Sequence, residues 1–585
     1  MNPHWIILFV MVPMAAGIAC VLLHRLKAVQ RGVGITALLL NVAVGVWAMA
    51  TVFADPAGRV LVSQMGNWPA PFGISIVVDP LSSIMLVTSG LVCLAVYLYC
   101  ITQLGPRFSG GYFHGLYMFL VFGVQWSFLT GDLFNLFVAF EIMLMASYAM
   151  FVMGTTPAQM RQAYKYVLLN LVGSMLFVTM CGLLYGQLGT LNMADMARIS
   201  MAGQLPRSSI PVIAMLLLVF GGKAAIFPLW YWLPDTYHTL PAPIGGLFAG
   251  LLTKVGAYVM IRVFVMMFAS PAVSDLLLPI VLISATVTMF VGVLGAVSMH
   301  TVRSILSIHI ISQVGYMVMG IGLGMSLGLA TGSRVLGVAG AIFFIMHNMV
   351  VKCCLFLCGG LMHDHAGSDD LDRIGGLLPR SPWLATLFMI AAMSLAGLPP
   401  TSGFFGKFAL IQAGWQAGGQ LGNAYYWVTG FAIATSLLTL LSMLKIWSYG
   451  FWSPPQGEHV THPQHRPRTI GGMTAVAMLV VLATGMGLGA NWCMSLTRIA
   501  AAHVIDPTAY ISAVLGPQHV PHVANADVKP EIRNPKSEIC QKEQGKMSNG
   551  ENKPGDDIGP LSLDLRSDFG LRISDFTAAR RADAR

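Results

Sequence analysis

Ionisable side chains recur inside stretches of sequence that are otherwise apolar. Lys223 lies within VFGGKAAIFPLW, Lys254 lies in the apolar stretch that follows, and Glu141 lies within FVAFEIMLMA. A lysine at the centre of a lipid bilayer costs about 2.5–3.5 kcal/mol on membrane-insertion scales, so a membrane protein that retains several of them uses them. Lysine, histidine and carboxylate side chains in series inside a membrane are typical of proton relays. The pattern therefore predicts proton transfer through the interior of the protein.

Glu141 and Lys223 are expected to form the pair on which this chemistry depends. Burial disfavours the charged form of each group, and contact between the two restores it. A pair that forms and separates would therefore change the proton affinity of Lys223 enough to move a proton. With the other ionisable groups of the apolar stretches, the pair gives this candidate proton path: Glu141, Lys223, Lys254, His309, His347, Lys352 and Lys407.

Some polar residues near this path have two interpretations. His309 titrates near neutrality and suits a relay, although a lone histidine on an apolar helix can also be a core residue with satisfied hydrogen bonds. Lys165 either anchors its helix at the membrane interface or tunes Glu141. His238, at the proline-rich turn LPDTYHTLPAP, is a candidate gate for the outlet of the proton path in the first half.

Other polar residues and the cysteines are interpreted as structural. Arg262 and Arg303 are expected to be interface anchors at helix ends. The segment HDHAGSDDLD, residues 363–372, could suggest a metal site, but it fits a solvated loop better. The nine cysteines follow no metal or disulfide spacing and are expected to pack as small core residues. No flavin, iron–sulfur or nucleotide motif occurs, so the sequence predicts neither a cofactor nor a bound metal.

Composition places these residues in a membrane protein. Of 585 residues, 56% are hydrophobic and 10% are charged, whereas a soluble domain typically carries about 25% charged residues. The formal net charge of +9 fits lysines and arginines in membrane-flanking loops and a basic tail. No basic patch with interleaved aromatic residues occurs, so a nucleic-acid partner is excluded. The first apolar run lacks a basic segment before it and is expected to be a retained helix, not a cleaved signal.

The fold class expected is all-α, a polytopic membrane protein. A membrane-spanning helix needs about 20 apolar residues, and the sequence offers fourteen such stretches. They lie near 5–23, 32–54, 78–100, 112–130, 132–153, 164–187, 209–233, 241–267, 273–297, 301–325, 334–360, 383–411, 424–450 and 470–491.

Two of these helices are expected to be broken, and their positions indicate an internal repeat. The seventh carries Lys223 and breaks at Pro228 and Pro234, and the twelfth breaks at Pro399-Pro400 and carries Lys407 after the break. Broken helices five positions apart, each with one lysine, suggest two related five-helix bundles. The domain organisation expected is 1–111 for helices one to three, 112–267 for the first repeat, 268–450 for the second, 451–505 for a loop and the fourteenth helix, and 506–585 for a disordered polar tail.

The distribution of basic residues predicts that both termini lie on the outer face of the membrane, because lysine and arginine concentrate in inside loops. With the N-terminus outside, the inside loops collect Arg25, Lys27, Arg31, Arg107, Arg161, Lys165, Arg303, Arg373, Arg380, Lys445, Arg466 and Arg468. The outside loops then collect Arg59, Arg198, Arg207, Arg262, Arg334 and Arg498.

Four segments resemble the antiporter-like membrane subunits shared by respiratory complex I and the Mrp cation/proton antiporters: GDLFNLFVAFEIMLMASYAM, FGGKAAIFPLWYWLPDTYHTLPAPIGGLFAGLLTKVGAY, HIISQVGYMVMGIGL and SLAGLPPTSGFFGKFALI. The segments KYVLLN and LYGQLGTLNMADM resemble the D-type Mrp subunits more closely than the complex I subunits. The resemblance spans roughly residues 1–500. It implies fourteen helices, two inverted five-helix repeats and a hetero-oligomeric complex, and it matches Glu141, Lys223, Lys254 and Lys407 to the proton path of the family. Where the family commonly has two adjacent histidines, this chain has His347-Asn348.

Three functions are compared. The leading hypothesis is a subunit of a multi-subunit antiporter in the cell inner (plasma) membrane, which exchanges protons for a monovalent cation, with Na⁺ expected, alongside the other Mrp subunits. The alternative is a proton-pumping membrane subunit of an NADH-quinone oxidoreductase or a membrane-bound hydrogenase, in which partner subunits would carry the redox chemistry. A passive channel is disfavoured because buried lysines would repel cations from an open pore.

Overall fold

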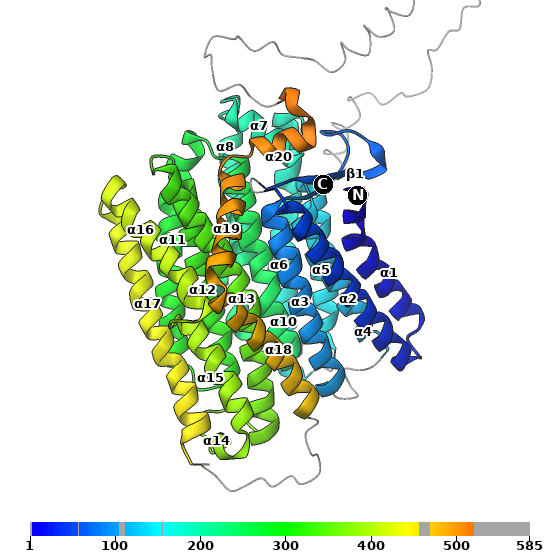
Figure 1. The fold of residues 1–585 in the computed structure, drawn as a ribbon, viewed down its shortest axis with the longest axis vertical. Coiled ribbons are helices and arrows are strands. Elements are labelled where there is room, and N and C mark those ends of the chain that lie inside the picture. Colours follow the sequence, from blue (N-terminus) through cyan, green and yellow to red (C-terminus); the bar gives the residue numbers. More distant parts are fainter. Residues whose placement is uncertain (1–2, 56–57, 105–110, 154–155, 455–468, 520–585) are drawn as a thin grey trace, which may run out of the picture. The chain divides into compact units, whose positions relative to one another are not determined.

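The computed structural model describes residues 3–55, 58–104, 111–153, 156–454 and 469–519. These residues form a bundle of helices with one small β-hairpin (Figure 1). The α-helices, in chain order, are α1 (Leu8–Leu22), α2 (Lys27–Val52), α3 (Pro80–Gln103), α4 (Phe113–Leu129), α5 (Leu133–Val152), α6 (Pro157–Leu188), α7 (Met193–Met201), α8 (Ser209–Ala224), α9 (Leu233–Tyr237), α10 (Ala242–Met260), α11 (Pro271–Ser298), α12 (Val302–Met325), α13 (Thr331–Ala366), α14 (Leu377–Arg380), α15 (Pro382–Ala396), α16 (Ser402–Leu421), α17 (Ala424–Trp447), α18 (Thr469–Leu488), α19 (Ala490–Ile505) and α20 (Thr508–Leu515).

Short helical turns and two strands complete the described structure. The turns are η1 (Pro3–Ile7), η2 (Met65–Asn67), η3 (Leu229–Trp232), the π-helical η4 (Ile261–Met267) and η5 (Ser448–Trp452), and η6 (Pro517–His519). Strands β1 (Leu61–Gln64) and β2 (Ser75–Val78) pair antiparallel, with Leu61 opposite Val78.

The predicted membrane-spanning helices are largely present. Within the described residues, twelve helical stretches are long and apolar enough to cross a membrane, and two shorter apolar helices are α4 and α15. The protein is therefore an all-α, polytopic membrane protein, as the composition predicted. The hairpin was not expected, since it lies between two apolar stretches in a segment with no helical pattern.

The structure interrupts one predicted stretch and corrects two other predicted boundaries. The stretch predicted as 383–411 is divided into α15 and α16, because Gly397 adopts a left-handed conformation (φ 87°) and two prolines follow it. After α18, helical structure resumes at Ala490 and continues to Ile505, beyond the predicted end at 491. The predicted tail at 506–585 begins with the helix α20, whose apolar face is buried. The remainder of that tail, from 520, lies outside the described residues.

Polar side chains set the starts of several helices. The carboxylates of Asp79 and Asp132 accept hydrogen bonds from the backbone N–H groups of Ser82 (2.9 Å) and Asn135 (2.8 Å). The side chain of Thr301 caps α12 in the same way. These oxygens satisfy N–H groups that have no partner inside the helix.

The helix α13 lies at the centre of the bundle. It packs against α3, α10, α12, α15, α16, α18 and α19. The apolar segments of α10, α12 and α13 are entirely buried, whereas α2 and α6 leave most of theirs exposed. The interior therefore contains the three helices that carry Lys254, His309, His347 and Lys352, and the exposed apolar faces are available to lipid or to other chains.

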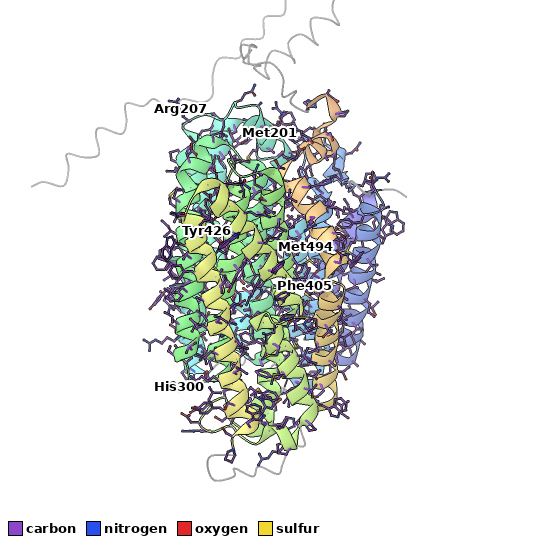
Figure 2. The ribbon with its side chains drawn as sticks, turned by 60° about the vertical axis from the view of Figure 1, so that its left-hand side comes forward. Met201, Arg207, His300, Phe405, Tyr426 and Met494 are labelled. Atoms are coloured by element: carbon purple, nitrogen blue, oxygen red, sulfur yellow. The ribbon has the colours of Figure 1, made fainter. Side chains whose placement is uncertain are left out.

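The two ends of the bundle differ. Figure 1 shows α7, α20 and β1 at one end and α14 at the opposite end. In Figure 2, Met201 and Arg207 lie at the end that carries α7, and His300 lies at the other end. We call the first the α20 end and the second the α14 end. The eight described cysteines are all buried and free, as predicted.

Candidate functional site

Lys223 lies in the last turn of α8, at a point where the helix stops inside the bundle. The helix ends because Ala225 adopts a left-handed conformation (φ 62°) and Pro228 follows. The indole N–H of Trp232 donates to the carbonyl of Gly222 (3.0 Å), which satisfies one of the carbonyl groups at the helix end. The Lys223 side chain is buried, and its Nζ donates to Ser174 Oγ at 3.4 Å.

A small cavity lies beside Lys223. It has a volume of about 10 Å³ and is lined by Phe140, Tyr166, Asn170, Trp232 and other residues of the first half. The Lys223 ammonium lies 5.1 Å from the centroid of the Phe140 ring. A cavity of this size has room for about one water molecule. A single water beside the ammonium group would be enough to carry a proton to or from it.

Glu141 is the neighbour of Phe140 on α5, and its carboxylate acts electrostatically on Lys223. The side chain is partly exposed, and its Oε1 has no hydrogen-bond partner in the described part of the chain. Within the described residues, no ion pair joins Glu141 to Lys223 at 4.0 Å or less. The structure therefore places the predicted pair within electrostatic reach and leaves it separated.

Lys254 and Lys352 occupy the centre of the bundle on the adjacent helices α10 and α13. Both side chains are completely buried. Lys254 Nζ donates to the carbonyl of Ala249 (2.6 Å) and to Thr253 Oγ1 (3.2 Å), and Lys352 Nζ donates to the carbonyl of Leu306 (3.4 Å). Each is within electrostatic reach of the other.

Lys254 also lies close to the end of α8. A Cβ atom at Gly256 would be 2.8 Å from the backbone nitrogen of Ala224 and 3.1 Å from the carbonyl carbon of Lys223. The absence of a side chain at Gly256 therefore allows α8 and α10 to touch between the two lysines. No hydrogen bond within the described residues joins Lys223 to Lys254 directly.

The two histidines of the path are buried and hydrogen-bonded to serines. His309 Nε2 lies 2.9 Å from Ser442 Oγ, and its Nδ1 lies 3.3 Å from Ser312 Oγ. His347 Nδ1 lies 2.9 Å from Ser402 Oγ, whereas its Nε2 has no partner among the residues that the structure describes. Both imidazoles feel the charges of Lys352 and Lys407. The neighbouring Asn348 donates back to its own helix, to the carbonyl of Phe344 (3.0 Å).

Lys407 lies in α16, directly after the interruption that separates it from α15. Its Nζ donates to the carbonyls of Leu395 (3.0 Å) and Ala396 (2.9 Å) and to Ser436 Oγ (3.2 Å). The two carbonyls belong to the last turn of α15, where a positive charge also interacts favourably with the helix dipole. Lys407, in the second turn of α16, thus satisfies carbonyl groups at the end of α15.

A buried ion pair was missed from the sequence. Arg262, predicted to be an interface anchor, is buried in η4 and holds both carboxylate oxygens of Asp79 with its two Nη groups, one of them at 2.7 Å. The sequence contains only a weak signal for it, since Arg262 lies inside the predicted span 241–267 and not after it. Its partner is 183 positions away in the chain, so nothing local pointed to the pair.

The remaining polar predictions concern residues at the α14 end. Lys165 Nζ pairs with Asp235 at 2.7 Å and lies over the Tyr231 ring, so its described partners do not include Glu141. His238 Nδ1 lies 2.8 Å from the carbonyl of Pro234, one turn back. Arg303 pairs with Asp369, which also contacts His363. Among the described residues, no group of histidine, cysteine, aspartate or glutamate side chains could hold a metal ion.

Comparison with known proteins assigns the family. A model of the membrane domain of NADH:quinone oxidoreductase and Mrp antiporter subunits matches residues 130–437. The chain is 40% identical over 517 residues to the D subunit of the Na⁺/H⁺ antiporter of Alkalihalophilus pseudofirmus, covering 87% of this chain and 99% of the relative. The chain therefore belongs to the NADH:quinone oxidoreductase/Mrp antiporter family, as its sequence motifs indicated.

Two solved structures share the fold. A chain of the Mrp complex from Dietzia sp. is 29% identical and superimposes with a TM-score of 0.78, covering 88% of this chain and 99% of that one. A chain of an archaeal membrane-bound sulfane sulfur reductase is 22% identical with the same TM-score of 0.78, covering 88% of this chain and 100% of that one. The second likeness shows the fold alone.

Proposed function

We propose that this chain is a subunit of a multi-subunit antiporter that exchanges protons for a monovalent cation, with Na⁺ the cation expected. The proposal is supported by the relatives that are named as D subunits of Na⁺/H⁺ antiporters and by the likeness to a chain of an Mrp complex. The other subunits of such a complex would be its partners. Both termini would lie on the outer face, so the α20 end would face outward.

The proton path would run through the interior in three sections. Glu141 and Lys223 form the first section, Lys254, Lys352 and the two histidines form the central one, and Lys407 forms the last. The single observation that carries this proposal is the burial of four lysines, of which only Lys223 has a carboxylate of the described residues acting on it. Such groups are costly in a membrane unless they take part in transport.

The path suggests how the two halves of the bundle are related. Helices α4–α10 and α11–α17 would be two inverted repeats, and the interruptions at 225–228 and 397–401 would be equivalent broken helices at the membrane midplane. Each would then place one lysine at a helix end, where unpaired backbone groups can bind ions or water.

The replacement Lys223→Ala tests the proposed function. It should abolish Na⁺-driven proton movement in everted vesicles that contain the whole complex, since the first section loses its proton carrier. The complex should still assemble, which co-purification of the partner subunits would check. Full exchange by the assembled Lys223→Ala complex would refute the proposal.

A proton-pumping subunit of a redox complex is the second candidate. The family includes NADH:quinone oxidoreductase subunits, and the fold is shared with a chain of an archaeal respiratory complex. The co-purified partners distinguish the two functions. Iron–sulfur subunits would favour the redox pump, and small membrane subunits without redox centres would favour the antiporter.

A further inference from the structure

Asp79 and Arg262 form an ion pair that is buried more completely than the other ion pairs of the described residues. Their side chains are 2% and 3% exposed, whereas each of the other pairs has at least one partner that is 22% exposed or more. Arg262 also donates to Ser82 Oγ (2.9 Å) and to the Tyr258 hydroxyl (3.0 Å). Because a buried ion pair often contributes no more stability than apolar residues of similar volume, its presence suggests another role.

The pair continues a row of polar groups that starts at the central lysine. Lys254, Tyr258 and Arg262 are spaced four residues apart, so they lie along one face of α10 and η4. The Tyr258 hydroxyl donates to the carbonyl of Phe128 (2.8 Å) and lies 3.4 Å from Ser82 Oγ. The row therefore leads from the middle of the bundle toward the α20 end.

The helix α20 covers the outer end of this row. The Arg262 guanidinium lies 5.5 Å from the centroid of the Tyr510 ring. A Cβ atom at Gly131 would be 3.1 Å from the Tyr510 hydroxyl, so that hydroxyl lies against the residue next to Asp132. Asp132 is partly exposed, and Tyr510 is within electrostatic reach of both Asp132 and Asp79. One buried tyrosine thus separates the ion pair from a carboxylate that reaches the surface.

We propose that Asp79 takes up protons at the outer end of the first half and that Arg262 closes this entrance. This inference rests on the proposed function. When Arg262 moves away, water at the α20 end protonates the Asp79 carboxylate. The resulting carboxylic acid gives its proton to the Ser82 hydroxyl, which contacts both Asp79 (2.8 Å) and Tyr258 (3.4 Å). Ser82 passes its own proton to the Tyr258 hydroxyl, and Tyr258 passes its own to the neutral amine of Lys254. Lys254 becomes an ammonium group, and Asp79 returns to the carboxylate that binds Arg262 again.

The structure corresponds to the closed state of this entrance. Arg262 holds both oxygens of Asp79. Lys254 Nζ donates to the carbonyl of Ala249, which lies toward the start of α10, whereas Tyr258 lies one turn further toward its end. Proton uptake therefore requires three movements: release of Asp79 by Arg262, rotation of the Tyr258 hydroxyl away from the Phe128 carbonyl, and a turn of the Lys254 side chain toward Tyr258.

A matched pair of tyrosine variants tests the route. In everted vesicles that contain the complete complex, Tyr258→Phe should lower the Na⁺-dependent rate about tenfold, since it removes the hydroxyl that relays the proton. Tyr237→Phe is the control, because Tyr237 is equally buried and its hydroxyl has no hydrogen-bond partner within the described ranges. The control should retain the rate of the unchanged protein. Equal rates in the two variants would overturn the route.

A second pair of variants distinguishes a proton entrance from an ion pair that only holds the start of α3 against η4. The double variant Asp79→Asn with Arg262→Gln removes both charges and keeps polar groups of similar shape. If Asp79 takes up protons, the assembled complex should lose exchange, and unchanged exchange would overturn the proposal. Arg262→Gln alone leaves Asp79 uncovered and should accelerate the loss of a pH gradient without Na⁺. A gradient lost no faster than in the unchanged protein would also overturn it.

Lys223→Ala, measured in the same vesicles, separates this inference from the proposed function. If Lys223→Ala keeps full exchange, the proposed function itself fails. If Lys223→Ala loses exchange while the double variant keeps it, only the entrance at Asp79 is wrong.

Discussion

The two halves of the bundle hold their lysines in different ways. In the first half, Lys223 has one hydrogen-bond partner in the described structure, the Ser174 hydroxyl at 3.4 Å, and a carboxylate within electrostatic reach. In the second half, Lys407 has three oxygen partners at 2.9 to 3.2 Å, two of which are carbonyls at the end of α15. No carboxylate acts on Lys407 among the described residues.

The difference indicates that the two lysines have unequal freedom. The surroundings of Lys223 can change when Glu141 approaches or withdraws, so its charge can be switched by a side-chain movement. The surroundings of Lys407 are mostly backbone groups, which move only if the ends of α15 and α16 move. We therefore expect switching in the first half to depend on side chains and in the second half on helix position.

The largest effect is expected for Glu141→Gln. This change keeps the shape of the side chain and removes the negative charge that acts on Lys223. Exchange should fall to background, because Lys223 then lacks the negative charge whose approach and withdrawal would change its proton affinity. Na⁺-driven dequenching of a pH-sensitive dye in everted vesicles measures this, with the amount of assembled complex as the control. If exchange persists, the switch does not depend on Glu141 and the contrast between the halves disappears.

A comparison of Lys223→Arg with Lys407→Arg sharpens the contrast. A guanidinium group keeps its proton, so Lys223→Arg should abolish exchange. Lys407→Arg should lower exchange about tenfold, because arginine can still bond the carbonyls of α15 but cannot release a proton readily. The same vesicle assay provides the rates. Full activity of Lys407→Arg would mean that Lys407 only closes the end of α15 and is not part of the proton path.

The smallest effects are expected for two serine variants. Ser174→Ala removes the described hydrogen-bond partner of Lys223 and should lower the exchange rate severalfold, about 1 kcal/mol for the loss of one long hydrogen bond. Ser436→Ala leaves Lys407 with two carbonyl partners and should change the rate less than twofold, on the order of a few tenths of a kcal/mol. Initial rates over a range of Na⁺ concentrations would resolve the two. A larger loss of rate for Ser436→Ala than for Ser174→Ala would show that Lys407 depends more on its serine partner than Lys223 does.

Much of the fold could be predicted because lipid imposes simple rules. Long apolar stretches must become helices that satisfy their own backbone groups, so their number and approximate ends follow from composition. Pro228 and Pro399-Pro400 gave a local signal for helix interruption, since proline removes a helix hydrogen bond. The hairpin from Leu61 to Val78 and the helix α20 were not predicted, because neither carries a long apolar run.

The site was predictable residue by residue, but its contacts were not. Buried lysines and histidines stand out in apolar sequence, whereas their partners are serine hydroxyls and backbone carbonyls that look ordinary in a sequence. Ser442, for example, is 133 positions from His309, to which it is hydrogen-bonded. Asp79 lies at the start of the predicted span 78–100, and nothing in the local sequence indicates its partner. Only the structure shows that Asp79, at the start of α3, is buried with Arg262 of η4.

The length of α13 has a further consequence. Its 36 residues correspond to about 54 Å of helix, nearly twice the thickness of the hydrocarbon layer. It touches helices of both halves, and one glycine near each end leaves little room for added atoms: a Cβ at Gly360 would lie 2.6 Å from Ala242, and one at Gly337 would lie 2.7 Å from Leu323. Because α13 is packed closely near both ends, we expect it to slide or tilt as one body. We therefore expect a displacement that begins at one face of the membrane to reach the opposite face through α13.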